Sequence, residues 1–168
     1  MLIHARVGKT IARGGWHTYA LTAGAVTATA AAGARAVDAD SAWYRALDKP
    51  SWQPPSWAFG AVWTPLYASI AWAGGRALNR TGGRVRLRLA ASLAANLTLN
   101  AGWNWLFFGR RSPKAGLLGT ALLNMSNAEL LYRTARADST AARALLPYAT
   151  WCVFATALNG SILRLNPS

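Results

Sequence analysis

The residues best suited to chemistry in this chain of 168 residues are aromatic and amide side chains that recur at helical spacing. Trp63 and Tyr67 lie four residues apart, and Asn96, Asn100 and Trp103 follow the same rule. Residues three or four positions apart share one face of a helix, so each set forms a stripe. Stripes that combine indole, phenol and amide groups suit the burial of a flat, largely apolar molecule with a few polar groups, although helix packing explains any one stripe alone.

Two other helical segments continue this pattern. Asn124 lies on a polar stripe, and Trp151 and Ala155 lie on a mixed one. We expect amides inside an apolar bundle to find partners there, so Asn100, Asn124 and Asn159 should face the interior. The full stripes are Phe59, Trp63, Tyr67 and Ile70; Asn96, Asn100, Trp103 and Phe107; Thr120, Asn124 and Asn127; and Tyr148, Trp151, Ala155, Leu158 and Ile162.

The sequence offers no set of residues typical of a metal site or a nucleophilic enzyme. His4 and His17 are its only histidines and Cys152 its only cysteine, so neither zinc-ligand spacing nor a Cys–His pair can be built. Glu129 is an acid inside an otherwise uncharged segment, which is a reason to suspect function. Arg133 follows four residues later, so we expect an ion pair at a helix end instead.

The charged residues indicate where such helices lie. Lys and Arg number 18 and Asp and Glu 5, so only 14% of residues are charged, against about a quarter in soluble proteins. Five intervals, 14–34, 50–75, 89–109, 115–132 and 144–163, contain one charge, Glu129. About 20 uncharged residues cross ~30 Å of hydrocarbon. We therefore predict an all-α integral membrane protein with spans at about 14–36, 56–78, 87–108, 113–133 and 143–164, after a basic extension at 1–13; a soluble bundle of Ala-rich helices is the alternative.

The net charge of +13 then reflects topology more than a bound polyanion. The N-terminus and the second and fourth loops carry eleven Lys or Arg residues and the opposite side seven, which places the N-terminus in the cytoplasm. We expect no nucleic acid on Arg84, Arg86 and Arg88, which we assign to a solvated loop near lipid headgroups. A cleaved signal peptide ending near Ala34 is the other interpretation of the first span, but its apolar run is longer than the usual 7–15 residues.

The segment Trp43–Trp57 is the densest aromatic and proline stretch of the sequence. Pro50, Pro54 and Pro55 should prevent regular helix within it, and a helix should begin at about Ser56. Such a loop suits either an interfacial belt on the headgroups or a lid over a cavity between helix ends.

Four ordered blocks of this sequence resemble the TspO/MBR family, the tryptophan-rich sensory proteins related to the translocator protein, or peripheral benzodiazepine receptor. They are Trp43–Pro55, Phe59–Tyr67, Leu99–Gly109 and Pro147–Asn159, and they cover nearly the whole chain after its N-terminal extension. The resemblance implies a bundle of five transmembrane helices whose first loop closes a ligand pocket, and frequent homodimers. The richness in Ala and Arg is typical of a GC-rich bacterial genome, so we expect the bacterial cytoplasmic membrane.

The resemblance also implies a ligand. Members bind tetrapyrroles such as protoporphyrin IX and haem, synthetic drugs and, in animals, cholesterol, with no cofactor required. Some promote light-dependent porphyrin breakdown, for which Trp63 and Trp151 would be the candidates here, although no enzyme activity is established by this. Carried over by position, the ligand-binding residues are Tyr44, Pro54, Ala58, Trp63, Tyr67, Asn100, Trp103, Asn124, Trp151 and Ala155.

Some positions depart from the family pattern. Ala58 replaces a frequent glycine and Trp103 a smaller aromatic residue, so we expect a narrower pocket. The segment Ala155–Arg164 lacks the tyrosine of the animal sterol motif, so cholesterol is not expected; no axial histidine for haem is obvious either. The leading interpretation is a tetrapyrrole sensor or regulator, and the alternative is a small-molecule or ion-coupled transporter, for which Glu129 is the only buried-acid candidate.

Overall fold

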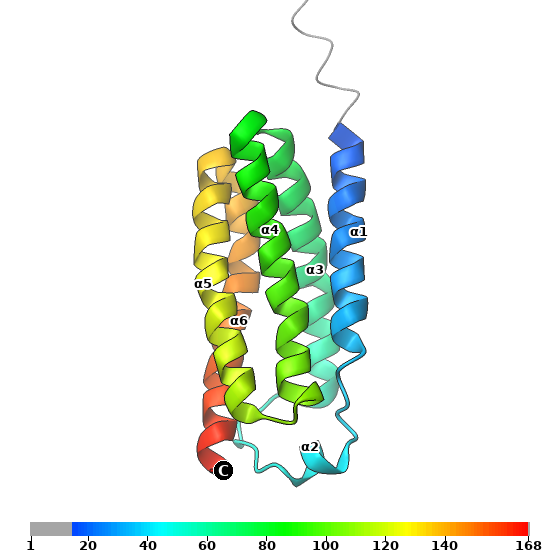
Figure 1. Cartoon of the computed structure of the whole chain (residues 1–168), viewed down its shortest axis with the longest axis vertical. Helices are drawn as coiled ribbons and strands as arrows, with labels where there is room; N and C mark the ends of the chain where they lie inside the picture. The colour runs from blue at the N-terminus through cyan, green and yellow to red at the C-terminus, as the bar shows by residue number, and fades with distance from the viewer. Residues whose placement is uncertain (1–14, 168) are drawn as a thin grey trace, which may run out of the picture.

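The computed structural model describes residues 15–167, so the basic extension expected at 1–13 lies outside the described residues. All regular structure in the described part is helical, and five long helices lie side by side with the short α2 beneath one end (Figure 1). The elements are α1 (Gly15–Ala34), α2 (Ala42–Ala46), α3 (Ser56–Asn79), α4 (Gly83–Asn104), the π-helical turn η1 (Trp105–Gly109), α5 (Pro113–Ala137) and α6 (Ser139–Leu165).

Most helix ends follow from local chemistry. Pro55 precedes the first residue of α3, Ser56, as predicted. Ser112 caps α5 by accepting a bond from the Ala115 backbone N–H at 3.2 Å, with Pro113 in the first turn. Asp138 alone separates α5 from α6 and caps α6, which forces these two helices into a tight antiparallel pair.

Three parts of the chain differ from expectation. The fourth loop, expected between about 133 and 143, is reduced to Asp138, so Arg133 and Arg136 lie on α5 and Arg143 lies on α6. The helix α4 begins at Gly83, not near residue 87, so Arg84, Arg86 and Arg88 lie on its first turns and the prediction of a loop there was wrong. A helix is possible because Gly83 adopts φ +52°, which only glycine tolerates easily, and turns the chain sharply after α3. The short helix α2 also lies inside the proline-rich stretch, but it ends before Pro50.

The five long helices form a closed ring in the order α1, α3, α6, α5, α4 and back to α1. Small residues allow close contact: Gly75 of α3 lies against the Tyr19 ring of α1. Beside it, the Thr22 hydroxyl donates to the Ala71 carbonyl at 2.9 Å. The centre is fully buried at Ile70, Ala73, Ala77 and Ala141.

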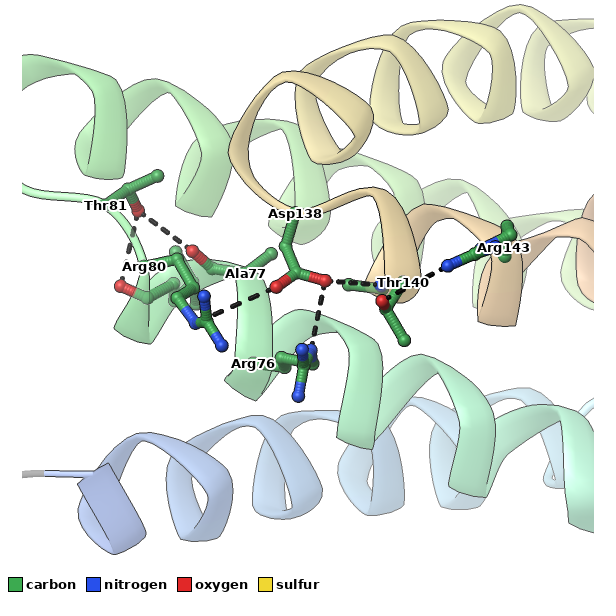
Figure 2. Close-up of polar contacts among 9 residues, drawn as sticks. Arg76, Ala77, Arg80, Thr81, Asp138, Thr140 and Arg143 are labelled. Carbon is green, nitrogen blue, oxygen red and sulfur yellow. Dashed lines mark hydrogen bonds and ion pairs between the residues drawn. The ribbon is translucent and has the colours of Figure 1, made fainter.

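A cluster of charges joins α3 to the turn between α5 and α6 (Figure 2). The Arg76 Nε donates to Asp138 Oδ1 at 3.0 Å, and the Arg80 Nε lies 3.7 Å from Oδ2. The Ala141 backbone N–H also donates to Oδ1, at 2.8 Å. The bond from Arg76, followed by that from Ala141, lowers the pKa of Asp138 below its ordinary value of 3.8.

Of the described helices, α6 alone combines the length and the apolar character usually required to cross a membrane, with a mean hydropathy of 1.2 over its best window. The other long helices contain much Ala, Gly, Thr and Asn, which lowers their hydropathy. Large apolar side chains nevertheless lie exposed around the bundle, among them Trp16, Leu21, Trp57, Met125 and Val153.

Candidate functional site

The first inter-helix loop folds on itself around Tyr44. The Ser41 hydroxyl caps α2 by accepting the Tyr44 backbone N–H at 3.3 Å. The Lys49 Nζ donates to the carbonyls of Tyr44 and Leu47 at 2.5 and 2.9 Å and lies 4.6 Å from the centroid of the Tyr44 ring. The Gln53 amide donates to the Tyr44 hydroxyl at 3.2 Å. Burial raises the pKa of the Tyr44 phenol, and the bond from Gln53 opposes this increase.

The same loop is attached to the end of α6. The Asp48 backbone N–H donates to Asn166 Oδ1 at 3.0 Å, and Asn166 Nδ2 donates back to the Asp48 carbonyl at 2.9 Å. This reciprocal pair holds the loop beneath the bundle, where Figure 1 shows α2 and the C-terminal end of α6.

Above the loop lies an aromatic cluster centred on Phe107, which is 3% exposed on the π-helical turn η1. Trp43 meets the Phe107 ring edge-on at 5.5 Å between centroids, Tyr44 does so at 6.3 Å, and Trp103 stacks on it at 6.1 Å. Trp43 and Tyr44 therefore point inward, as a lid would. Trp57, in contrast, is 75% exposed, so the aromatic residues of this stretch face both the bundle and the surface.

A second row of rings connects the loop to α6 and α3. Trp52 contacts Phe154 at 5.7 Å, Phe154 contacts Trp151 at 4.9 Å, and Trp151 contacts Phe59 at 6.0 Å. Phe59 and Phe154 also pack against the buried cluster of Phe107, Leu158 and Ile162, so the two sets of rings share one apolar core.

Deeper in the bundle, Trp63 stacks on Tyr67 at 5.2 Å and meets Tyr148 edge-on at 6.2 Å. A chain of hydrogen bonds, which we call the amide relay, begins at Tyr67 and continues through Asn100, Tyr148 and Asn96 to Asn127. The Tyr67 hydroxyl donates to Asn100 Oδ1 at 3.0 Å, and Asn100 Nδ2 donates to the Tyr148 hydroxyl at 3.3 Å. The Tyr148 hydroxyl donates to Asn96 Oδ1 at 2.9 Å, and Asn96 Nδ2 donates to Asn127 Oδ1 at 2.7 Å.

The amide relay joins α3, α4, α5 and α6 and lies in the buried centre, where Asn96 is 0% and Asn100 2% exposed. The carry-over from the family blocks did not include Asn96, Asn127 or Tyr148 among the ligand-binding residues. The sequence did indicate that these three residues are buried, because they belong to the amide and aromatic stripes. A connected polar network of this kind fixes a unique packing of its helices. At its end, Asn127 Nδ2 has no hydrogen-bond partner among residues 15–167.

The remaining predicted residues have different surroundings. Asn124 is only half-buried and donates to the Thr156 hydroxyl at 2.7 Å, so it joins α5 to α6. Asn159 is buried as expected. Pro54, Ala58 and Ala155 are half-buried, the first two at the start of α3 and the last on α6.

We call the end of the bundle next to the first loop, which contains the rings around Phe107 and those around Trp151, the aromatic half. Several of its buried polar atoms have no hydrogen-bond partner among residues 15–167. They are the indole nitrogens Nε1 of Trp103 and Trp151 and the amide oxygens of Asn159 and Gln53. A buried polar group without a partner costs about 1–3 kcal/mol, so such groups are candidates to meet a ligand.

Two open grooves mark the surface. One, of about 660 Å³, lies between α3 and α6, and one of about 550 Å³ lies between α4 and α5. Trp151 is the one member of the ten predicted ligand-binding residues that lines either groove. The others pack against neighbouring side chains, so a ligand among them would have to displace rings or the loop.

The sequence profile of the TspO/MBR family matches residues 19–165, which include every element of this aromatic half. The chain belongs to the TspO/MBR family. Within this family of membrane proteins, the chain is 38% identical over 152 residues to the tryptophan-rich protein TspO of Chlorobaculum tepidum, covering 89% of this chain and 96% of that one.

Two further relatives extend the range of the comparison. The translocator protein of Homo sapiens is 32% identical over 126 residues, covering 74% of this chain and 75% of its own. The tryptophan-rich sensory protein of Cereibacter sphaeroides is 33% identical over 124 residues, covering 74% and 77%. This TspO/MBR chain thus aligns over most of its length with both bacterial and animal members.

Proposed function

We propose that this TspO/MBR chain is a membrane sensor that binds a tetrapyrrole such as protoporphyrin IX in the half of the bundle covered by the first loop. The observation that supports the proposal is a pair of ring sets, one around Phe107 and one around Trp151 and Phe154. Both pack against the buried residues Phe107, Leu158 and Ile162, and each set includes an indole N–H group without a partner among residues 15–167. The names of its relatives, sensory protein and translocator protein, support a membrane receptor role.

The ring faces supply dispersion and apolar burial for a planar macrocycle. The N–H groups of Trp103 and Trp151 would donate to its propionate or ring acceptors, while the amide relay keeps Tyr67 and Trp63 in place. The loop would release Tyr44 from Phe107 to admit the ligand, because these side chains now fill the space.

Metal-free protoporphyrin suits this site better than haem. His17, the one histidine within residues 15–167, is exposed in the first turn of α1, at the end of the bundle away from α2 (Figure 1). Haem would therefore bind through its ring faces and propionates without an axial imidazole.

The proposal includes five membrane spans formed by α1, α3, α4, α5 and α6, with the N-terminus in the cytoplasm of a bacterium and a homodimer as the assembled form. An ion-coupled transporter is less well supported. Glu129 is exposed and bonded to Arg133, with 2.6 Å between the carboxylate and the guanidinium, which is the ion pair predicted from their spacing.

Titration of the purified full chain in detergent with protoporphyrin IX, followed by tryptophan fluorescence in the dark and in light, tests this function. We expect saturable quenching that Trp63→Phe and Trp151→Phe each weaken, whereas Trp16→Phe, which alters an exposed ring on α1, leaves the affinity unchanged. Unsaturable quenching in the wild-type protein would contradict the site. Loss of the porphyrin spectrum in light would add porphyrin breakdown, with Trp63 and Trp151 as its candidates.

A further inference from the structure

The groove between α3 and α6 borders the proposed ligand site at Trp151 and Phe154 but extends away from it along α6 to Arg143. The α6 residues that line the groove recur at intervals of three and four, so they form one face of that helix. The groove opens on the outer surface, and its volume of about 660 Å³ is within the usual range of ligand sites, roughly 300–1,000 Å³. Its lining comprises Val62 and Leu66 of α3 and Arg143, Leu146, Pro147, Thr150, Trp151 and Phe154 of α6.

The length of the groove matches one leaflet of a bilayer. Arg143 and Phe154 are its outermost α6 residues, and at 1.5 Å per residue they lie about 16 Å apart along the helix. That is about half of a ~30 Å hydrocarbon core. Arg143, the single charged residue of the lining, lies near the start of α6, beside the α5–α6 turn. The apolar lining residues follow along the helix from there.

At the Arg143 end of the groove, the positive charges outnumber the negative ones. Figure 2 shows Asp138 bonded to Arg76 and Arg80, while the Arg143 side chain reaches only the Thr140 hydroxyl among the described residues, at 3.4 Å. Two arginines therefore share the Asp138 carboxylate, and Arg143 has no acidic partner among residues 15–167. A guanidinium that lacks an acidic partner is suited to phosphate oxygens, to which it donates two parallel hydrogen bonds.

The wall of the groove also offers a polar group near this end. Pro147 has no backbone N–H, so the Arg143 carbonyl lacks its usual helical donor. The Arg143 carbonyl would accept a hydrogen bond from a headgroup that carries hydroxyls. The exposed Thr150 lies about 10 Å further along the helix, beside the path proposed for the acyl chain.

We propose that this groove binds one anionic phospholipid, with an acyl chain along α6 and the phosphate on Arg143. The inference rests on the proposed membrane placement, in which this end faces the cytoplasmic leaflet and its anionic lipids. Trp151 contributes both to the groove and, through Phe59, to the aromatic half, so the lipid would contact a residue that also meets the tetrapyrrole site.

Native mass spectrometry of the full chain in detergent tests this site, with dioleoyl phosphatidylglycerol and dioleoyl phosphatidylcholine added separately. We expect one phosphatidylglycerol retained per chain in preference to phosphatidylcholine. Arg143→Gln should reduce phosphatidylglycerol retention several-fold, to the level of phosphatidylcholine, and Thr150→Trp, which fills the groove, should reduce both. The matched control is Arg84→Gln, an exposed arginine of α4 at the same end and outside the groove, which should retain the lipid as the wild type does.

Three outcomes would overturn the proposal: unchanged retention in Arg143→Gln, unchanged retention in Thr150→Trp, or an equal loss in Arg84→Gln. Lipid-free dimers that dissociate in Thr150→Trp would also overturn it, because they would assign the groove to a second copy of the chain. None of these results would affect saturable protoporphyrin binding, so failure of the lipid site is distinguishable from failure of the proposed function.

Discussion

At the scale of single residues, the amide relay separates side chains that hold the bundle from those available to a ligand. Asn96, Asn100 and both tyrosines bond to one another, whereas the indole N–H groups of Trp103 and Trp151 have no partner in the described part of the chain. The amide and tyrosine spacing in the sequence predicted buried polar stripes. It could not predict which amides pair with each other, because that depends on how the helices are ordered around the ring.

Replacement of Tyr67 by phenylalanine tests the amide relay. The ring remains for Trp63 to stack on, but Asn100 Oδ1 loses its donor at 3.0 Å. We expect a loss of about 1–3 kcal/mol in stability, the cost of one unsatisfied buried acceptor. Thermal unfolding in detergent measures it.

The control for this measurement is Tyr132→Phe. The Tyr132 hydroxyl is exposed and accepts a bond from Arg136 at 3.1 Å, so its removal should change the unfolding temperature little. Equal shifts in the two variants would show that the relay does not stabilise the bundle.

At the scale of helices and loops, proline and charge made most boundaries predictable. The start of α3 after Pro55 was predicted from proline chemistry. The one-residue turn at Asp138 was not predicted, because a loop was expected between about 133 and 143. The π-helical turn at Trp105–Gly109 and the early start of α4 were not predictable, because periodicity does not distinguish a π turn from an α turn and because a glycine pair is equally compatible with a longer loop.

Asp138→Asn should weaken the junction between α3 and the α5–α6 turn. The variant removes the negative charge of the carboxylate that Arg76 and Arg80 both contact. The two positive guanidinium groups then lie close together without a counter-charge from residue 138. Because the folded-state pKa of Asp138 is lowered, its contribution to stability is present above about pH 4 and is lost as the pH falls through the folded-state value.

Unfolding of the wild type and Asp138→Asn, measured between pH 3 and pH 7, checks this expectation. The wild type should be the more stable above about pH 4, and the difference should shrink below it. A difference that is constant across this range would contradict the assigned ion pair.

Asn166→Ala should loosen the loop over the aromatic half. It removes both hydrogen bonds to Asp48, the reciprocal pair that attaches the loop to α6. We expect protoporphyrin IX to associate and dissociate several-fold faster in stopped-flow fluorescence, with a smaller change in affinity. Unchanged rates would mean that the loop does not limit ligand entry.

At the scale of the whole molecule, the segregation of charge predicted five membrane spans, although α6 alone among the described helices has the usual hydropathy. The other long helices have a lower hydropathy because they contain small and polar residues, which pack against neighbouring helices within the ring. The order of the helices around the bundle and the positions of the grooves could not be predicted, since both depend on which helices pack against each other.

Single cysteines placed in a Cys152→Ala background test the predicted orientation. Ser51 in the first loop and Ser139 at the α5–α6 turn are exposed and lie at opposite ends of the bundle. In intact cells, a membrane-impermeant maleimide should label Ser51→Cys and should label Ser139→Cys only after lysis. The reverse pattern would place the N-terminus outside the cytoplasm.

The most direct test of the central claim, a tetrapyrrole site in the aromatic half, is to locate the bound ligand by its own photochemistry. One equivalent of protoporphyrin IX is bound to the full chain, irradiated briefly, and the oxidised tryptophans are mapped by mass spectrometry against an unbound sensitiser at equal dose. We expect Trp63, Trp103 and Trp151 to be oxidised first, relative to the unbound sensitiser. Preferential oxidation of the exposed Trp16, Trp57 and Trp72 would contradict it.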